Sequence, residues 1–274
     1  MAHLAPAREG GTTPAVDPRL RLARDREAVP WWANPLVILG ALAVWEILVR
    51  IEVLSPLYFP PPTAVGRRLW QLFADGTYVA HGRATLYRMA VGLLVGTSLG
   101  FLLGVAMGRS GPFRRILDPI VGAIYPIPKI AILPLVMIFL GIGESSKLFV
   151  VALGAFFPML ISTLTGVVHI PSIYFEVAKT YGSGPLDLLR RVILPASLPT
   201  VLGGFRIALN SVIHITIAVE IVSAVTGLGS LVWFSWETLD VEKLYATLTV
   251  IAVLGVVTTH TVNRLSQKLV PWRS

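Results

Sequence analysis

The chain has 274 residues, of which 54% are hydrophobic and only 14% are charged, and its mean hydropathy is +0.73. Soluble domains carry about 25% charged residues, so the composition indicates a membrane protein. The absence of cysteine excludes disulfides, thiolate metal sites and cysteine nucleophiles. A net charge of +8 would suit a nucleic-acid partner, but the positions of the basic residues give it another explanation.

Residues 1–30 are polar and rich in proline and arginine, and they contain no apolar core. They are therefore not expected to form a cleavable signal peptide. We expect a polar cytoplasmic tail over residues 1–30, followed by a membrane domain over residues 31–274. The first apolar segment of that domain would serve as an uncleaved insertion signal.

A transmembrane helix needs about 20 mostly apolar residues. Six windows meet this requirement, at about residues 31–53, 89–107, 119–142, 148–170, 199–225 and 244–262. The sequence thus predicts an all-α, polytopic membrane protein with about six transmembrane helices. In the first window Glu46 and Arg50 stand four residues apart, a spacing that allows them to pair.

The basic residues predict the orientation of these helices. With the N-terminus inside, 14 lysines and arginines lie in inner segments and six in outer segments, while three fall within spans. The positive-inside rule then places both termini on the cytoplasmic side of the cell membrane. The same bias explains the positive net charge without any nucleic acid.

The segment between the first two windows predicts a short helix. Pro60-Pro61-Pro62 stops the preceding element and offers Thr63 as an N-cap. Apolar residues then recur at helical spacing (Val65, Leu69, Leu72 and Phe73). Such a helix either lies on the outer membrane surface or packs against the other helices.

The second window carries five glycines spaced four apart, from Gly92 to Gly108. This spacing leaves a smooth groove along one helix face, where another helix can approach closely. The partner helix belongs either to the same chain or to a second copy.

The third window is interrupted by Pro126, Pro128 and Pro134, each of which removes a backbone donor. We expect a broken span there, covered by protein or by a water-filled cavity. Lys129 lies within the interruption. It either extends toward the cytoplasmic surface or stands beside a translocation pathway.

The fifth window holds Arg206, Asn210, His214 and Glu220 within a stripe about 120° wide on one helix face. Each of these side chains is costly in lipid, so the stripe should face the bundle interior or a water-filled path. The four residues, with Lys129, are candidates for lining a translocation pathway. The alternative is internal pairing that fixes helix packing.

The cytoplasmic loop at about residues 171–195 predicts two short helices. Ser172 can cap the first helix, and Gly182 suits its left-handed end. Pro185 stands in the first turn of a second helix that runs to about Arg191, and Leu194-Pro195 ends it. The result is either a rigid protrusion that fits a groove on a partner or an ordinary loop.

Part of this loop, EVAKTYGSGPLDLLRRVILP at residues 176–195, resembles the EAA signature of binding-protein-dependent ABC importer permeases. The matching residues are Glu176, Ala178, Gly182, Val192, Leu194 and Pro195. Val177 replaces the usual second alanine, and Val192 replaces the usual isoleucine. The resemblance implies a type I importer permease whose loop docks on a separate ABC ATPase. Coupling would be carried by Glu176, Ala178, Gly182, Leu194 and Pro195.

The stretches PIPKIAILPLVMIFLGIGESSKLF and GLGSLVW resemble the nitrate, sulfonate and taurine branch of these permeases, and the similarity extends from about Trp45 to the C-terminus. It implies delivery of a small solute by an external solute-binding protein, and a second permease subunit, most simply another copy of this chain. ATP and Mg²⁺ would be bound by the ATPase, and this chain would need no cofactor. The solute is either an anion, which Arg206 and Lys129 favour, or a neutral molecule such as a pyrimidine vitamin precursor.

Catalytic and metal-binding motifs are absent from the sequence. Residues 141–147, GIGESSK, resemble a phosphate-binding loop, but the spacing fails and the segment is expected to face outward. The chain is therefore not expected to be an enzyme. Two other classes are compatible with the sequence: an ion-coupled secondary transporter with Glu220 and His214 as a proton relay, and a membrane scaffold without transport activity.

Overall fold

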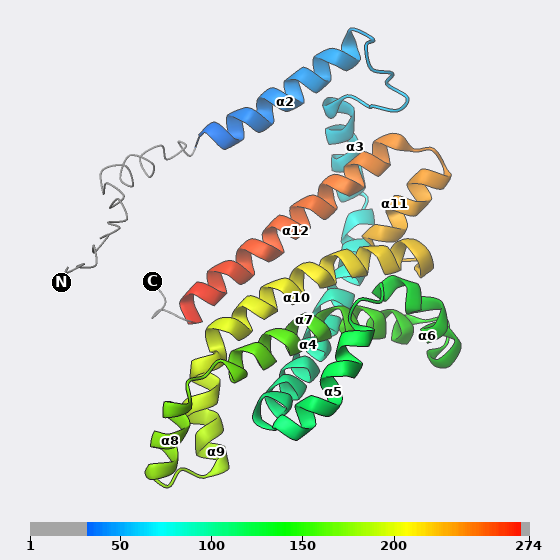
Figure 1. Ribbon diagram of the computed structural model, residues 1–274. Helices are drawn as coiled ribbons and strands as arrows, with labels where there is room; N and C mark the ends of the chain where they lie inside the picture. Colours follow the sequence, from blue (N-terminus) through cyan, green and yellow to red (C-terminus); the bar gives the residue numbers. More distant parts are fainter. Residues whose placement is uncertain (1–31, 270–274) are drawn as a thin grey trace, which may run out of the picture. The chain divides into compact units, whose positions relative to one another are not determined.

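A computed structural model of the protein describes residues 32–269, and all regular secondary structure within this range is helical (Figure 1). The predicted tail of residues 1–30 lies outside the described residues. The described residues divide into two units, the first ending at Leu54 and the second beginning at Ser55. The first unit contains α2 (Ala33–Arg50), on which Arg50 pairs with Glu46 at 2.7 Å, as the spacing predicts.

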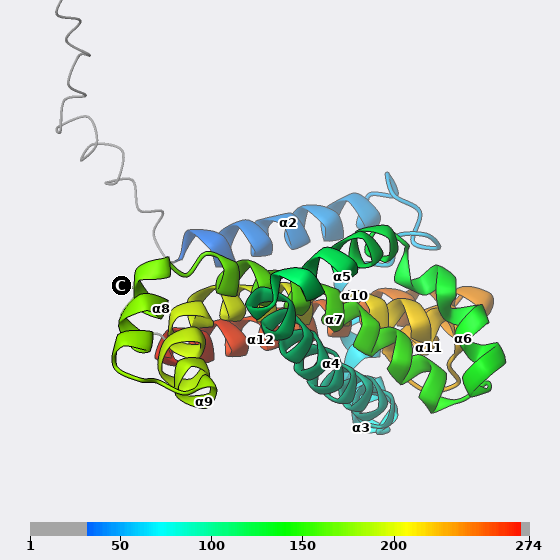
Figure 2. The same ribbon diagram turned by 60° about the horizontal axis from the view of Figure 1, so that its bottom comes forward.

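The second unit contains the remaining helices. In chain order these are α3 (Pro62–Ala74), α4 (Thr77–Arg109), α5 (Gly111–Ile124), the 3-10 turn η1 (Lys129–Ile132), α6 (Leu133–Leu140), α7 (Glu144–Val168), α8 (Ser172–Thr180), α9 (Pro185–Leu188), the π-helical turn η2 (Leu189–Ile193), α10 (Leu194–Ser223), α11 (Leu228–Glu237) and α12 (Val241–Leu269). Figures 1 and 2 place the α8–α9 loop at one end of this unit and α6 and α11 at the other.

The number of apolar spans agrees with the sequence. Within the described range, five helices are long and apolar enough to cross a membrane, or six if one bent pair counts as a single span. That pair is α5 with the η1–α6 segment, and it bends by 90°. The bend lies at Pro126 and Pro128, where the prolines offer no N–H to continue the α5 ladder. The prediction of a broken third span is confirmed.

The glycines of α4 pack against α7 within the same chain. A β-carbon at Gly96 would lie 2.1 Å from the carbonyl oxygen of Ala152, and one at Gly100 would lie 2.4 Å from that of Phe156. Only glycine permits this approach, which both views show as two helices lying side by side (Figure 2). Of the two alternatives, packing within one chain is confirmed.

The short helix α3 packs against the bundle. Val65 and Leu72 are buried in a cluster with Tyr78, Leu228 and Leu231, as the packed alternative predicts. The predicted N-cap is wrong. Pro61 is the N-cap and the helix begins at Pro62, whose fixed φ suits a first helical position, so Thr63 already lies inside the helix.

The 171–195 loop departs from its prediction at two points. Ser172 is the first residue of α8 and makes no capping hydrogen bond, because Pro171 takes the N-cap position. Leu194-Pro195 does not end the second helix, since α9 runs through η2 directly into α10. In a regular α-helix the ring of Pro195 would collide with the carbonyl of residue 191. The wider π-helical turn lies at this position and lets the helix continue.

Candidate functional site

The turn after α8 is built around Gly182. Its φ is +67°, and its N–H donates to the carbonyl of Lys179 at 3.0 Å. The N–H of Ser183 donates to the carbonyl of Ala178, also at 3.0 Å. This pair of bonds is the Schellman motif, in which glycine takes the left-handed position. The predicted left-handed end of the first helix is confirmed.

The solvent-exposed surface of the loop is apolar and aromatic. A hollow of about 440 Å³ is lined mainly by Ile173, Tyr174, Val177, Tyr181 and Val192. The Tyr181 side chain is 85% exposed. Exposed tyrosines around a hollow are typical of protein-binding surfaces. The arrangement therefore suits docking of a partner protein.

The five predicted coupling residues take different places in this loop. Ala178 is buried, and its small side chain lies on the side of α8 that faces the protein, whereas Glu176 is exposed on the same helix. Leu194 and Pro195 begin α10, directly after the π-helical turn. Gly182, Ala178 and the Leu194-Pro195 pair thus shape the loop, and Glu176 is available to a partner.

Three of the four stripe residues on α10 share an exposed face. Arg206, Asn210 and His214 are exposed, and the Thr259 hydroxyl of α12 donates to the Asn210 side-chain oxygen at 3.4 Å. Glu220 is different. Its side chain has no exposed surface and is paired with Arg88, as the alternative of internal pairing predicts.

Lys129 lies at the break between α5 and η1. Its ammonium group donates to the carbonyls of Tyr125 and Ile127, the latter at 2.8 Å. It also lies over the rings of Tyr125 and Phe157, at 5.2 and 4.8 Å from their centroids. Lys129 therefore satisfies carbonyls at the point where the prolines interrupt the helix.

The network around Arg88 is absent from the sequence prediction, in which Arg88 is one of the six basic residues counted in outer segments. Its side chain is only 2% exposed, and its donors have partners on α7, α10 and the following loop. Two nitrogens bond to the Glu144 carboxylate at 2.7 and 2.8 Å, and Nη1 bonds to Glu220 at 2.7 Å. The carbonyl and the hydroxyl of Thr226 accept the remaining bonds.

Glu220 is held from its other side by α4 and by the start of α11. Its Oε2 accepts from the Thr85 hydroxyl at 3.0 Å and from the Gly229 N–H at 2.9 Å. The backbone of Gly227 has φ +128°, and a β-carbon there would lie 2.2 Å from the Glu220 carboxyl carbon. The glycines of the Gly227-Leu228-Gly229 segment thus make room for the buried carboxylate.

One signal in the sequence points to Arg88. It stands four residues before Gly92, in the same register as the glycine stripe, so it faces α7 as the glycines do. The partner on α10 leaves no such signal, because Glu220 lies 132 positions away.

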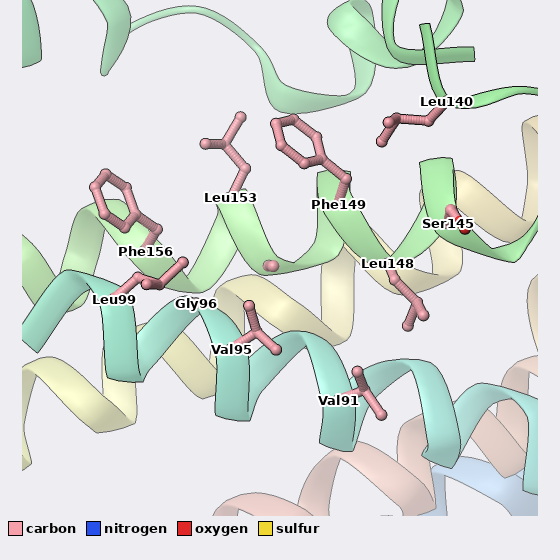
Figure 3. Close-up of a pocket in the computed structure, with 11 residues that line it drawn as sticks. Val91, Val95, Gly96, Leu99, Leu140, Ser145, Leu148, Phe149, Leu153 and Phe156 are labelled. Carbon is pink, nitrogen blue, oxygen red and sulfur yellow. The ribbon is translucent and has the colours of Figure 1, made fainter.

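A second hollow, of about 440 Å³, lies between α4 and α7 (Figure 3). Its lining is almost entirely apolar, with Val91, Val95 and Leu99 from α4 and Phe149, Leu153 and Phe156 from α7. Ser145 supplies its only polar side chain among the described residues. It therefore offers no charged group to a solute.

Residues 96–273 match the model of a family described as the binding-protein-dependent transport system inner membrane component. The chain belongs to this family. The matched range includes the 171–195 loop and the α10 stripe. The resemblance that the loop carries is thus confirmed, and the protein is a multi-pass membrane permease of an ABC importer.

Curated relatives cover most of this permease. The taurine transport system permease protein TauC of Escherichia coli (strain K12) is 35% identical over 84% of this chain and 86% of its own length. The putative aliphatic sulfonates transport permease protein SsuC of Bacillus subtilis (strain 168) is 29% identical over 93% of this chain and 92% of its own length. Both similarities reach beyond the 171–195 loop to nearly the whole chain.

The fold is shared with a solved transporter. A chain from inward-facing conformations of the MetNI methionine ABC transporter superposes with a TM-score of 0.60, covering 67% of this chain and 92% of its own. At 21% sequence identity this likeness shows the fold alone. The predicted type I importer architecture is confirmed.

Proposed function

We propose that this permease passes a small organic sulfonate, such as taurine, across the cell membrane. The observation that carries the proposal is its similarity to TauC, at 35% identity over 84% of the chain. The similarity to two SsuC proteins, named for aliphatic sulfonates, supports the same class of solute.

The basic residues within the spans favour an anionic solute. Arg206 is exposed on the same face of α10 as Asn210 and His214, and Lys129 stands at the helix break. A cation beside the path offsets part of the cost of bringing a sulfonate into a low-dielectric region. Two permease copies would double these charges around one passage.

Energy would come from a separate ABC ATPase docked on the 171–195 loop. ATP and Mg²⁺ would be bound by that ATPase, so this chain would carry no cofactor and no catalytic activity of its own. The aromatic hollow beside Tyr181 and the fixed turn at Gly182 support this loop as the docking surface. Glu176 is an exposed charge of the signature through which the ATPase would be recognised.

The assembly would contain two copies of this permease, two ATPase subunits and an external solute-binding protein. Both termini would lie in the cytoplasm, since 14 basic residues fall in inner segments and six in outer segments. Closure of the ATPase pair would draw the two loops together and turn the path from inward-facing to outward-facing.

The test is ATP-dependent uptake of taurine by the complex reconstituted in liposomes with its solute-binding protein. Arg206→Gln should lower the number of taurine molecules moved per ATP, while Arg264→Gln, an exposed arginine on α12, should not. Uptake of a neutral pyrimidine without taurine would overturn the assigned solute class. Uptake without ATP would overturn the importer mechanism.

A further inference from the structure

A basin opens beside the buried Arg88 network, at the end of the bundle that the proposed topology places outside. Its volume is about 580 Å³, and α4 forms one wall with Ala80, Arg83, Ala84 and Tyr87. Arg88, Glu144 and Thr226 form the rest of the lining. The two alanines leave the space that larger side chains would fill.

The charges of the basin do not balance. The network beneath it contains two cations, Arg88 and Lys147, and two carboxylates, Glu144 and Glu220, all joined by ion pairs. Arg83 is exposed and makes no hydrogen bond or ion pair with any residue in the range 32–269. The basin therefore presents one uncompensated positive charge over a neutral floor.

The floor of the basin is fixed. The guanidinium of Arg88 is tied to α7, to α10 and to Thr226, and the Gly227 turn is locked against Glu220. A partner that enters the basin meets a surface that needs no rearrangement, which lowers the entropic cost of binding.

Arg83 and Tyr87 stand four residues apart on the same face of α4, and Tyr87 is 55% exposed. Arginine and tyrosine are enriched among residues that dominate protein–protein binding energies. Arg83 lies six residues, or about 9 Å of helix, before the apolar window that begins at Met89. Both side chains are exposed in the structure, and Arg83 lies on the aqueous side of that window.

From these observations we infer that the basin is the docking site of an acidic surface element of the external solute-binding protein. Arg83 pairs with a carboxylate of that protein, and Tyr87 packs against the neighbouring side chains. The inference rests on the proposed function, which supplies the partner, and it adds the position of the contact. A lipid headgroup would use Arg83 alone and leave the rest of the basin without a role.

The test measures binding of the solute-binding protein to the assembled transporter in nanodiscs of neutral phosphatidylcholine. Arg83→Glu should weaken binding at least tenfold, and Tyr87→Ala should weaken it several-fold. Arg83→Lys should retain most of the affinity, because the charge is kept. Arg67→Glu, which reverses an exposed arginine on α3 outside the basin, should change it less than twofold. Binding to the unaltered transporter should weaken with added salt more steeply than binding to the Arg83→Glu variant.

Three results would overturn the inference. Equal effects of Arg83→Glu and Arg67→Glu would show that the basin is not the contact. An Arg83 effect that appears only with anionic lipid would assign the site to the membrane. The chain has no cysteine, so Arg83→Cys introduces the only thiol of the permease. If oxidation joined two permeases through this thiol, the basin would be assigned to a second copy of the chain. If the unaltered complex showed no ATP-driven uptake, the proposed function would fail instead.

Discussion

Arg88 joins α4 to α7, to α10 and to Thr226 through a buried guanidinium. Arg88→Met would leave Glu144 and Glu220 without their shared cation, one of them fully buried. Removing one partner of a buried ion pair costs about 3–5 kcal/mol. We expect a large fall in the thermal unfolding midpoint of the purified protein.

Arg83→Met serves as the control for this prediction, since Arg83 lies on the same helix and forms no ion pair with the described residues. Glu220→Gln should cost less than Arg88→Met, because glutamine still accepts hydrogen bonds from Thr85 and Gly229. Similar midpoints for Arg88→Met and Arg83→Met would contradict the role of the network.

Gly227 is expected to tolerate no side chain. At φ +128° any β-carbon is strained, and here it would also overlap the Glu220 carboxylate. Gly227→Ala should therefore lower the unfolding midpoint. Gly255→Ala, in the middle of α12 with no atom within 4 Å of the added carbon, should leave it unchanged or raise it. Equal responses of the two variants would rule out the close contact.

At the scale of elements, the turn after α8 should decide coupling. Gly182→Val places a β-branched side chain at φ +67°, which costs on the order of 1–3 kcal/mol and distorts the loop. We expect insertion into the membrane with loss of ATP-driven uptake. Gly184 has an ordinary φ of −71°, so Gly184→Ala should retain uptake.

A charge reversal on α8 tests recognition rather than shape. Glu176 is exposed, so Glu176→Lys should leave the fold intact and weaken co-purification of the ATPase.

Normal transport by membranes that contain Gly182→Val would argue against the turn as the coupling element.

The start of α12 is stabilised by Asp240, which joins it to α3. Asp240 accepts from Arg68 at 2.7 Å and from the N–H of Lys243 at 3.1 Å. Burial raises the pKa of Asp240, but the bonds from Arg68 and Lys243 outweigh it and hold the pKa below the usual value of 3.8. The carboxylate should therefore contribute stability at neutral pH that is lost as the pH falls through this lowered pKa.

We expect Asp240→Asn to cost about 1 kcal/mol at pH 7, a small figure because both partners of the pair are partly exposed. The difference in the free energy of unfolding between Asp240→Asn and the unaltered protein should become smaller in acid. Asp187→Asn, which breaks an exposed pair with Arg191, should have no measurable effect. A difference for Asp240→Asn that stays constant from pH 7 into acid would contradict the assignment.

For the whole molecule, the main prediction is its orientation. Reporter fusions should place residues 1–30, the segment 109–115 where α4 meets α5, the 171–195 loop and the C-terminus in the cytoplasm, as the charge bias requires. The Arg83 basin should be reached by reagents from outside only. An outward-facing 171–195 loop would contradict the proposal that the ATPase docks on this loop.

Several features of this protein follow from the sequence because they depend on local chemistry. Apolar length fixes the spans, Pro126 and Pro128 fix the break, and Gly182 fixes the end of α8. The 176–195 signature identifies the family in the same way. Each of these requires only neighbouring residues and the backbone geometry that they permit.

The tertiary structure decided what depends on distant partners. Arg88 and Glu220 are 132 positions apart, and Arg68 and Asp240 are 172 apart, so no local pattern pairs them. Helical periodicity puts Glu220 on a stripe with Arg206, but it cannot tell that a buried guanidinium on α4 neutralises that carboxylate. The glycine stripe likewise predicts a close helix contact, and only the packing of α4 on α7 shows that the contact lies within one chain. Sequence periodicity gives the face of a helix, whereas the partner of that face is set by packing of the whole bundle.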